Sequence, residues 1–147
     1  ARIIHLLKQQ QVDASMLYTS DHGEDIFDDG RHLFLHASPV PSYYQLHVPL
    51  LLWTSDSYRE EYPGIEKAAS MNRQKNISSS ISFFQTMMEL AGIETPYRND
   101  SLSVTSPLYT EKSRVYLNDH NEPHSLDDIG MRKEDFEMLK KRGIDAQ

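Results

Sequence analysis

The chain contains no cysteine, which excludes both a disulfide framework and a cysteine-ligated metal site. It has no run approaching the roughly 18 consecutive apolar residues of a membrane-spanning helix, and no recognisable signal peptide. Basic residues are fewer than acidic ones, with 15 Lys and Arg against 22 Asp and Glu. The resulting net charge of -7 argues against nucleic acid as the main partner, because phosphate backbones select for basic surfaces.

The remaining composition is that of a folded protein. Hydrophobic residues make up 38% of the 147 residues, enough for a core, and this length suits one domain. The chain begins at Ala1 and passes at once into apolar residues at helical spacing, namely Ile3, Ile4, Leu6 and Leu7. We therefore expect residues 1–147 to form a single domain that is a fragment or a processed product of a longer protein.

Apolar patterns of two kinds follow one another along the chain. Short apolar runs predict strands at residues 15–19, 47–54 and 115–117. Helical spacing predicts helices near residues 3–11, 56–61, 77–92 and 132–142; Pro63-Gly64 ends the second and Gly92 the third, while residues 66–74 are ambiguous. A helix that feeds a continuously apolar strand is typical of an α/β sheet covered on both faces.

An Asp-His pair stands where the first predicted strand ends. Asp21 and His22 follow this strand, and Gly23 lets the backbone turn sharply after them. Carboxylate and neutral imidazole are good ligands for zinc or manganese, so the pair fits a hydrolytic site in which a cation stabilises charge on a transferring phosphoryl or sulfuryl group. The alternative is structural: Asp21 caps a turn and His22 bonds a backbone carbonyl.

Residues 21–41 form a long loop rich in acidic residues and histidine. His32 and His36 are four residues apart, but Leu33 stands where the zinc-protease motif requires its Glu. His32 is interpreted as a surface residue. The segment around Asp28 lacks the spacing of a calcium loop and is interpreted as a turn. The histidines elsewhere are interpreted as structural or exposed: His47, His120 and His124.

Three blocks in a fixed order carry a resemblance: Ser20-Asp21-His22-Gly23-Glu24, Leu35-His36, and Gln45-Leu46-His47-Val48-Pro49-Leu50-Leu51-Leu52-Trp53. The chain resembles the C-terminal part of the catalytic domain of the alkaline-phosphatase superfamily, in the branch of phosphoethanolamine transferases and related sulfatase-like membrane enzymes. The resemblance is strong over residues 17–53 and extends to the helix at 77–93. It implies the C-terminal portion of a three-layer sandwich with a mostly parallel sheet.

The resemblance also implies roles for individual residues. Asp21 and His22 would hold a divalent metal, zinc first, with manganese or calcium as alternatives. His36 would be catalytic, binding the transferred phosphate or sulfate, or would help to bind a second metal; Glu24 and His47 lie in the motifs without an assigned role. The nucleophile, a threonine in this branch, would come from a missing N-terminal half, and Thr19 is not its equivalent.

Substrate and location follow from the same resemblance. The substrate would be a phosphate or sulfate ester, such as a lipid headgroup or a glycan, and the full-length protein would lie in the cell envelope, on the periplasmic or extracellular face of the inner membrane. One departure concerns the substrate: Ala37-Ser38 replaces the glycine that usually follows the histidine.

Two protein ligands are fewer than catalytic zinc usually has. We therefore predict that this chain alone is inactive and binds metal weakly. We also expect it to self-associate through strand edges that its missing half would cover, or to expose apolar surface there. The alternative from another class is an acidic, non-catalytic interaction module whose histidines are structural.

Overall fold

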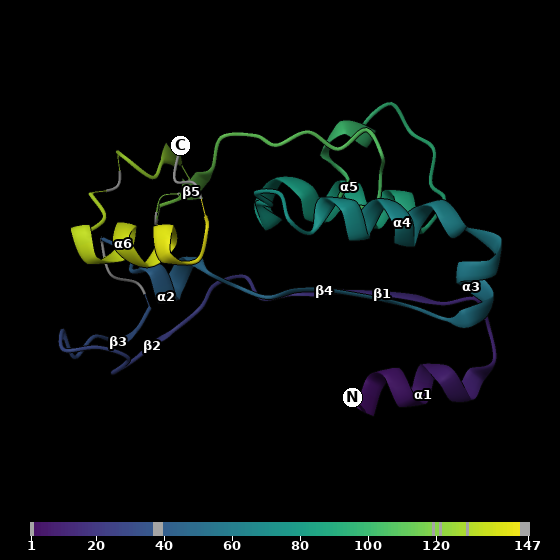
Figure 1. The fold of residues 1–147 in the computed structure, drawn as a ribbon, viewed down its shortest axis with the longest axis horizontal. Coiled ribbons are helices and arrows are strands. Elements are labelled where there is room, and N and C mark those ends of the chain that lie inside the picture. Colours follow the sequence, from purple (N-terminus) through teal and green to yellow (C-terminus); the bar gives the residue numbers. More distant parts are fainter. Residues whose placement is uncertain (1, 37–39, 119, 121, 129, 145–147) are drawn as a thin grey trace. The chain divides into compact units, whose positions relative to one another are not determined.

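The computed structural model describes residues 2–36, 40–118, 120, 122–128 and 130–144 (Figure 1). The chain divides into two compact units. Unit 1 comprises residues 1–18 and 50–111, and unit 2 comprises residues 19–49 and 112–147. The expectation of a single domain over residues 1–147 stays a prediction.

Unit 1 is built around a pair of strands. Strand β1 (Ser15–Thr19, whose last residue belongs to unit 2) pairs with β4 (Leu50–Thr54). The backbone N–H of Ser55 donates to the carbonyl of Ala14 at 2.8 Å, which places the end of β4 beside the start of β1. Figure 1 shows helix α1 (Arg2–Gln10) on one side of this pair and helices α4 (Pro63–Asn72) and α5 (Ser79–Leu90) on the other.

Local signals set the helix boundaries of unit 1. Helix α3 (Asp56–Glu61) has its predicted limits, and the side chain of Ser55 caps it by accepting from the N–H of Tyr58. The prediction that Pro63-Gly64 ends this helix overlooked α4, because Pro63 opens α4 at the first helical position, where its missing N–H costs nothing. Helix α5 confirms the third predicted helix, and Gly92 follows its end with φ +63°.

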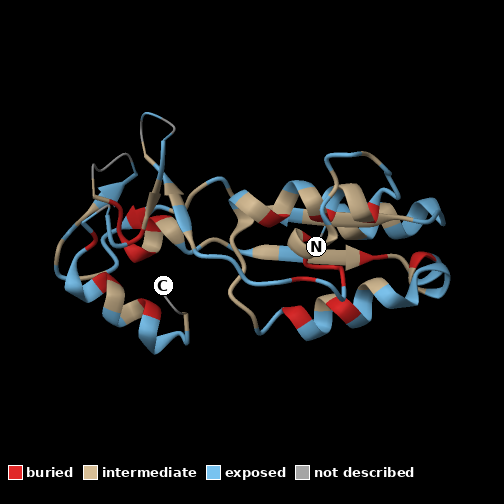
Figure 2. Ribbon diagram, turned by 90° about the horizontal axis from the view of Figure 1, so that it is seen from above, coloured by how far each residue is buried: buried red, intermediate tan, exposed pale blue. Residues whose placement is uncertain are grey.

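The turn-rich segment after α5 is held by polar side chains. It contains one short 3-10 helix, η1 (Asp100–Leu102). The Asn72 side chain donates to the carbonyls of Val104 and Ser106 at 3.0 and 2.8 Å, and Thr86 Oγ1 accepts from the N–H of Val104 at 3.0 Å. Asn72 and Thr86 are 2% and 1% exposed (Figure 2 colours buried residues red), so hydrogen bonds from α4 and α5 replace the regular ladder that this segment lacks.

The described residues of unit 2 form two hairpins and two helices. Strands β2 (Asp25–Ile26) and β3 (Phe34–Leu35) pair antiparallel, as do β5 (Val115–Leu117) and β6 (Pro123–Ser125). Helix α2 spans Tyr43–Leu46 and α6 spans Lys133–Lys141. The core of the unit is a cluster of four buried side chains: Tyr43, Leu126, Met131 and Leu139.

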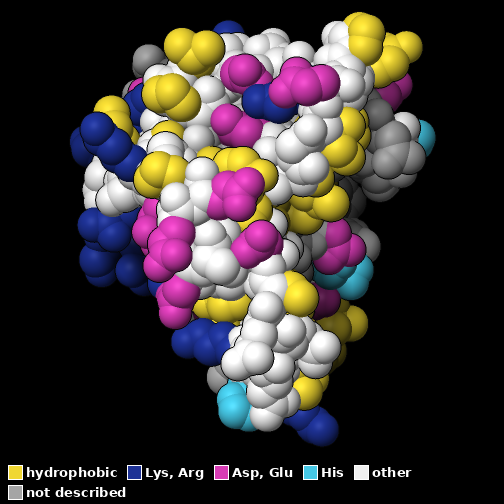
Figure 3. All heavy atoms as spheres, turned by 90° about the vertical axis from the view of Figure 1, so that its right-hand side faces the viewer, with side chains coloured by type: hydrophobic (Ala, Val, Ile, Leu, Met, Phe, Trp, Pro, Cys, Tyr) yellow, Lys and Arg dark blue, Asp and Glu magenta, His cyan; other side chains and the backbone are white. Residues whose placement is uncertain are grey.

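These elements make a mixed α/β fold. The described strands form three two-stranded sheets, so the three-layer sandwich with a mostly parallel sheet stays a prediction. Within the described residues, no helix combines the length and the apolar character needed to cross a membrane. Large hydrophobic side chains of unit 1 are exposed, among them Leu6, Met71 and Phe84. On the face that Figure 3 shows, hydrophobic side chains (yellow) lie among acidic ones (magenta).

Candidate functional site

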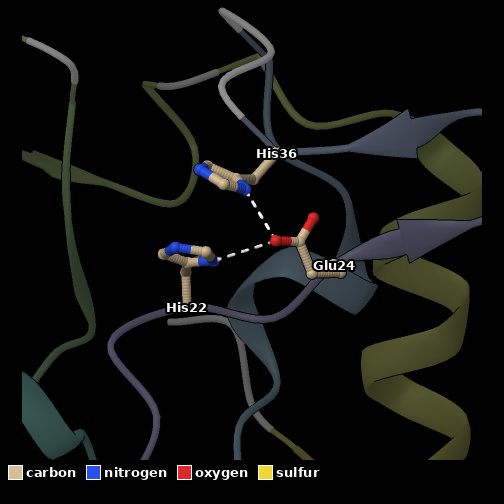
Figure 4. Close-up of side chains that lie close together, drawn as sticks. All are labelled: His22, Glu24 and His36. Carbon is tan, nitrogen blue, oxygen red and sulfur yellow. Dashed lines mark hydrogen bonds and ion pairs between the residues drawn. The ribbon is translucent and has the colours of Figure 1, made fainter.

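Two histidines and a glutamate come together in unit 2 (Figure 4). Nδ1 of His36 lies 2.7 Å from Oε1 of Glu24, and Nδ1 of His22 lies 3.9 Å from the same oxygen. The two imidazole rings are 3.9 Å apart between centroids, with their planes at 33°. The structure thus brings together His22 and His36, two of the three predicted site residues. Glu24, to which the sequence assigned no role, approaches both rings with the same carboxylate oxygen.

Gly23 allows the backbone that carries His22 and Glu24 to lie close to helix α2. Its N–H donates to the carbonyl of Gln45 at 2.7 Å. A Cβ at residue 23 would lie 1.9 Å from the backbone oxygen of Tyr44, so only glycine fits. The sequence interpretation gave Gly23 a sharp turn; the structure adds a close approach of two backbones.

Asp25, which directly follows Glu24, is hydrogen-bonded to helix α2 and to its N-cap residue Ser42. The Asp25 side chain is buried and accepts from the hydroxyl of Ser42 at 2.6 Å and from the side-chain amide of Gln45. Glu24 directly precedes β2 and is exposed, whereas Asp25 is buried. The Glu24 side chain is accordingly 40% exposed and can reach both histidines.

The hydrogen bonds of His22 identify its metal-competent nitrogen. Nδ1 lies 2.9 Å from the carbonyl oxygen of Gly23, which can only accept, so Nδ1 carries the proton and Nε2 keeps the lone pair. Nε2 lies 3.8 Å from Oδ2 of Asp21. Two ligands bound at zinc distances in a tetrahedron are about 3.4 Å apart, so the pair fits one cation after a small movement.

Asp21 is the most exposed of the predicted site residues, with 88% of its side chain accessible. Its pKa lies below the ordinary value, first because its own backbone N–H donates to the carboxylate and then because His22 is near. Asp21 therefore stays ionised, as a metal ligand must.

A second donor set shares His22 with the first. Ligand atoms of His22, Glu24 and His36 all lie within 4.8 Å of one another, and no other such group of three occurs among the described residues. Two imidazoles and a carboxylate are also a known ligand set for catalytic zinc. Glu24 can thus act in two ways, either as a ligand or as the group that orients His36.

Three other histidines that the sequence singled out have contacts of their own in unit 2. His32 adopts φ +53° in the β2–β3 loop, with its ring 6.4 Å from that of Phe27. His47 stacks on Tyr43, whose hydroxyl lies 2.7 Å from Nδ1; burial first, and then nearby arginines, lower the pKa of His47. His124 lies 3.1 Å from the side-chain amide of Asn118 on the β5–β6 hairpin. Ala37 and Ser38, the departure noted in the sequence, lie outside the described residues.

Comparison with known proteins finds a family model and relatives that match this chain. The family model described as Sulfatase matches residues 1–93. Phosphoethanolamine transferase EptA of Salmonella typhimurium is 32% identical over 111 residues, which cover 72% of this chain and 20% of that protein. Phosphoethanolamine transferase CptA of the same organism is 29% identical over 113 residues, covering 76% and 19%. The chain thus spans about a fifth of the length of the curated relatives that it matches.

A solved structure shares the fold. Crystal structures of the C-terminal periplasmic domain of EptC from Escherichia coli, one of them in complex with Zn, match with a TM-score of 0.74 at 24% identity. The match covers 90% of this chain and 37% or 36% of that domain.

Proposed function

This chain belongs to the sulfatase family, as its three sequence blocks predict, and on that premise we propose that it is part of a metal-dependent enzyme of the cell envelope that acts on phosphate or sulfate esters. Phosphoethanolamine transfer is the favoured activity, since the relatives carry that name, and a lipid headgroup is the favoured substrate. The E. coli domain of the same fold is periplasmic, which supports a periplasmic location. The convergence of His22, Glu24 and His36 is the observation that carries the proposal.

We assign Asp21 and His22 to a divalent cation, with zinc favoured over manganese or calcium. Oδ2 of Asp21 and Nε2 of His22 are the donor atoms, and the Gly23 carbonyl holds the ring through Nδ1. When bound, the cation would neutralise negative charge on the ester oxygens. Zinc in the related E. coli structure supports this choice of metal.

We assign His36 to the transferred group. Glu24 holds its Nδ1 at 2.7 Å, which turns Nε2 away from Glu24. In the form that carries a proton on both ring nitrogens, Nε2 is then the nitrogen that donates to an ester oxygen. A donor fixed in advance stabilises charge as it develops on that oxygen. The nucleophile and the further metal ligands would come from outside these 147 residues, so the chain alone should be inactive and should bind zinc weakly.

The two donor sets are separated by zinc titration of the 147-residue chain in a calorimeter. With Asp21 and His22 as ligands, Asp21→Asn lowers the affinity by at least roughly tenfold. His32→Gln is the matched control and leaves the affinity unchanged, because His32 lies apart from the cluster. Unchanged binding by Asp21→Asn, together with loss of binding in Glu24→Gln, would instead establish His22, Glu24 and His36 as the ligands.

The activity is tested on the full-length protein as encoded, with phosphatidylethanolamine and an aryl sulfate as alternative substrates. We expect transfer of phosphoethanolamine, lost in His36→Ala with the protein still folded. Cleavage of the sulfate ester alone would assign a sulfatase instead. Absence of both reactions would favour the acidic interaction module.

A further inference from the structure

The loop that joins Glu24 to His36 has little apolar contact to hold it. Its strands, β2 and β3, are two residues long, and such a hairpin is marginal by itself. Four of its large apolar side chains are at least half exposed: Ile26, Phe27, Phe34 and Leu35. The rings of Phe27 and Phe34 stack on each other, with their centroids 5.1 Å apart. Something else must fix the position of His36, which directly follows β3.

An ion pair with helix α6 supplies this anchor. The Arg31 guanidinium donates to both oxygens of Asp135, from Nη1 at 2.7 Å and from Nη2 at 2.9 Å. The Asp135 side chain is 1% exposed and that of Arg31 is 15% exposed. Arg31 also donates to Asp29 within the loop, and its hydrogen bonds to the two carboxylates raise the pKa of Arg31. Two parallel hydrogen bonds fix a guanidinium in direction as well as in distance.

The same carboxylate also fixes helix α2. Oδ1 of Asp135 accepts from the N–H of Tyr43, the first residue of α2, at 2.9 Å. The carbonyl of Gln45, in the same helix, accepts a hydrogen bond from the N–H of Gly23. Asp135 therefore connects to the His36 side of the site through Arg31 and to the His22–Glu24 side through α2.

We propose that Asp135 is a positioning residue, which with Arg31 sets the spacing of His36 from His22 and Glu24. The inference rests on the proposed function only for its effect on catalysis. Residues 1–93 match the Sulfatase family model, so Asp135 lies beyond the matched region. Helix α6 would thus complete a site whose recognisable motifs all lie in the first third of the chain.

The test reads the His36 ring directly, by nitrogen-15 NMR of the 147-residue chain at neutral pH. In the unsubstituted chain, the contact with Glu24 should give His36 the pattern of a ring protonated at Nδ1. We expect Asp135→Asn to convert it to the averaged pattern of a mobile histidine. His124, on the β5–β6 hairpin, reports whether unit 2 is still folded. Glu134→Gln, an exposed neighbour on α6, is the control and should leave His36 unchanged.

A second variant covers the case in which Asp135→Asn does not fold. Arg31→Lys keeps the charge but cannot form the two-pronged contact, so it should also release His36. A folded Asp135→Asn chain with the original His36 pattern would overturn the proposal; if that variant unfolds, an unchanged His36 pattern in Arg31→Lys overturns it.

Catalysis by the full-length protein gives the second readout. Misplacement of a group by about 1 Å can cost up to roughly a hundredfold in rate. We therefore expect Asp135→Asn to lower kcat at least tenfold, with a smaller change in KM. If Asp135→Asn changes the His36 pattern but the unsubstituted full-length protein has no activity, the positioning role of Asp135 stands. The proposed function is then rejected.

Discussion

Substituting Gly23 by alanine tests the close contact that supports the site. The added Cβ would lie 1.9 Å from the carbonyl oxygen of Tyr44 and 3.0 Å from its carbon. Both are backbone atoms and cannot rotate away. Since carbon and carbonyl oxygen approach to about 3.3 Å, the two segments must separate by about 1.4 Å. This movement breaks the 2.7 Å hydrogen bond from Gly23 to Gln45.

The magnitude follows from these two effects. A lost backbone hydrogen bond costs about 1 kcal/mol, and forcing extra volume into a packed contact costs about 1–3 kcal/mol. We expect Gly23→Ala to lower the free energy of unfolding by about 2–4 kcal/mol. For a chain of this length, that corresponds to a fall in Tm of roughly 5–15 °C, measured by circular dichroism. Zinc affinity should fall as well, because Asp21 and His22 precede the displaced residue.

Gly30→Ala is the matched control in the same loop. A Cβ there meets nothing within 4 Å, so its unfolding free energy should change by less than about 0.5 kcal/mol. If the Tm of Gly23→Ala equals that of Gly30→Ala and of the unsubstituted chain, residues 23 and 44 are not in contact. The close backbone contact described for the site is then wrong.

Three further predictions concern pH, the polar core and association. Because burial lowers the pKa of His47 below 6.5, the unfolded chain binds the extra proton and stability falls as the pH drops below that value; His47→Gln should lose less stability on acidification, and parallel curves would refute this. Asn72→Ala removes both hydrogen bonds to the carbonyls of Val104 and Ser106 and should cost about 2–3 kcal/mol in chemical unfolding, whereas exposed Arg73→Ala should cost little. Light scattering of the isolated chain should show self-association, and a clean monomer at high concentration would contradict it.

The sequence predicted the strands and helices that depend only on residues close to them in the chain. Strands at residues 15–19 and 115–117 and helix α3 appear at the predicted limits, since apolar runs and a capping Ser55 act within a few residues. Helix α2 was missed although Ser42 and Gln45 have the spacing of a capping box, because its four residues are too few to show a helical spacing of apolar residues. The order of the strands in a larger sheet depends on partners that no local pattern specifies.

The site also contains residues that motifs reveal and residues whose contacts depend on distant parts of the chain. His22 and His36 were predicted from motifs, and the structure brings their rings together. The roles predicted for Asp21, His22 and His36 stay predictions. Glu24 stood inside a quoted motif, yet its contact with His36 depends on how the intervening loop returns. Asp135 gave no signal, because its partner Arg31 is 104 residues away and an acidic residue in a first helical turn is ordinary.

The hydrogen bonds of the two histidines suggest how a weak site becomes a strong one. Each ring has its Nδ1 occupied within unit 2, by the Gly23 carbonyl for His22 and by Glu24 for His36. Each therefore presents Nε2, with ring direction fixed before any ligand arrives, and that fixing removes part of the entropy cost of binding. Orientation is a property of these 147 residues, whereas ligand number is not. The full-length protein should therefore exceed the isolated chain in zinc affinity while leaving the Nδ1-protonated patterns of both histidines unchanged.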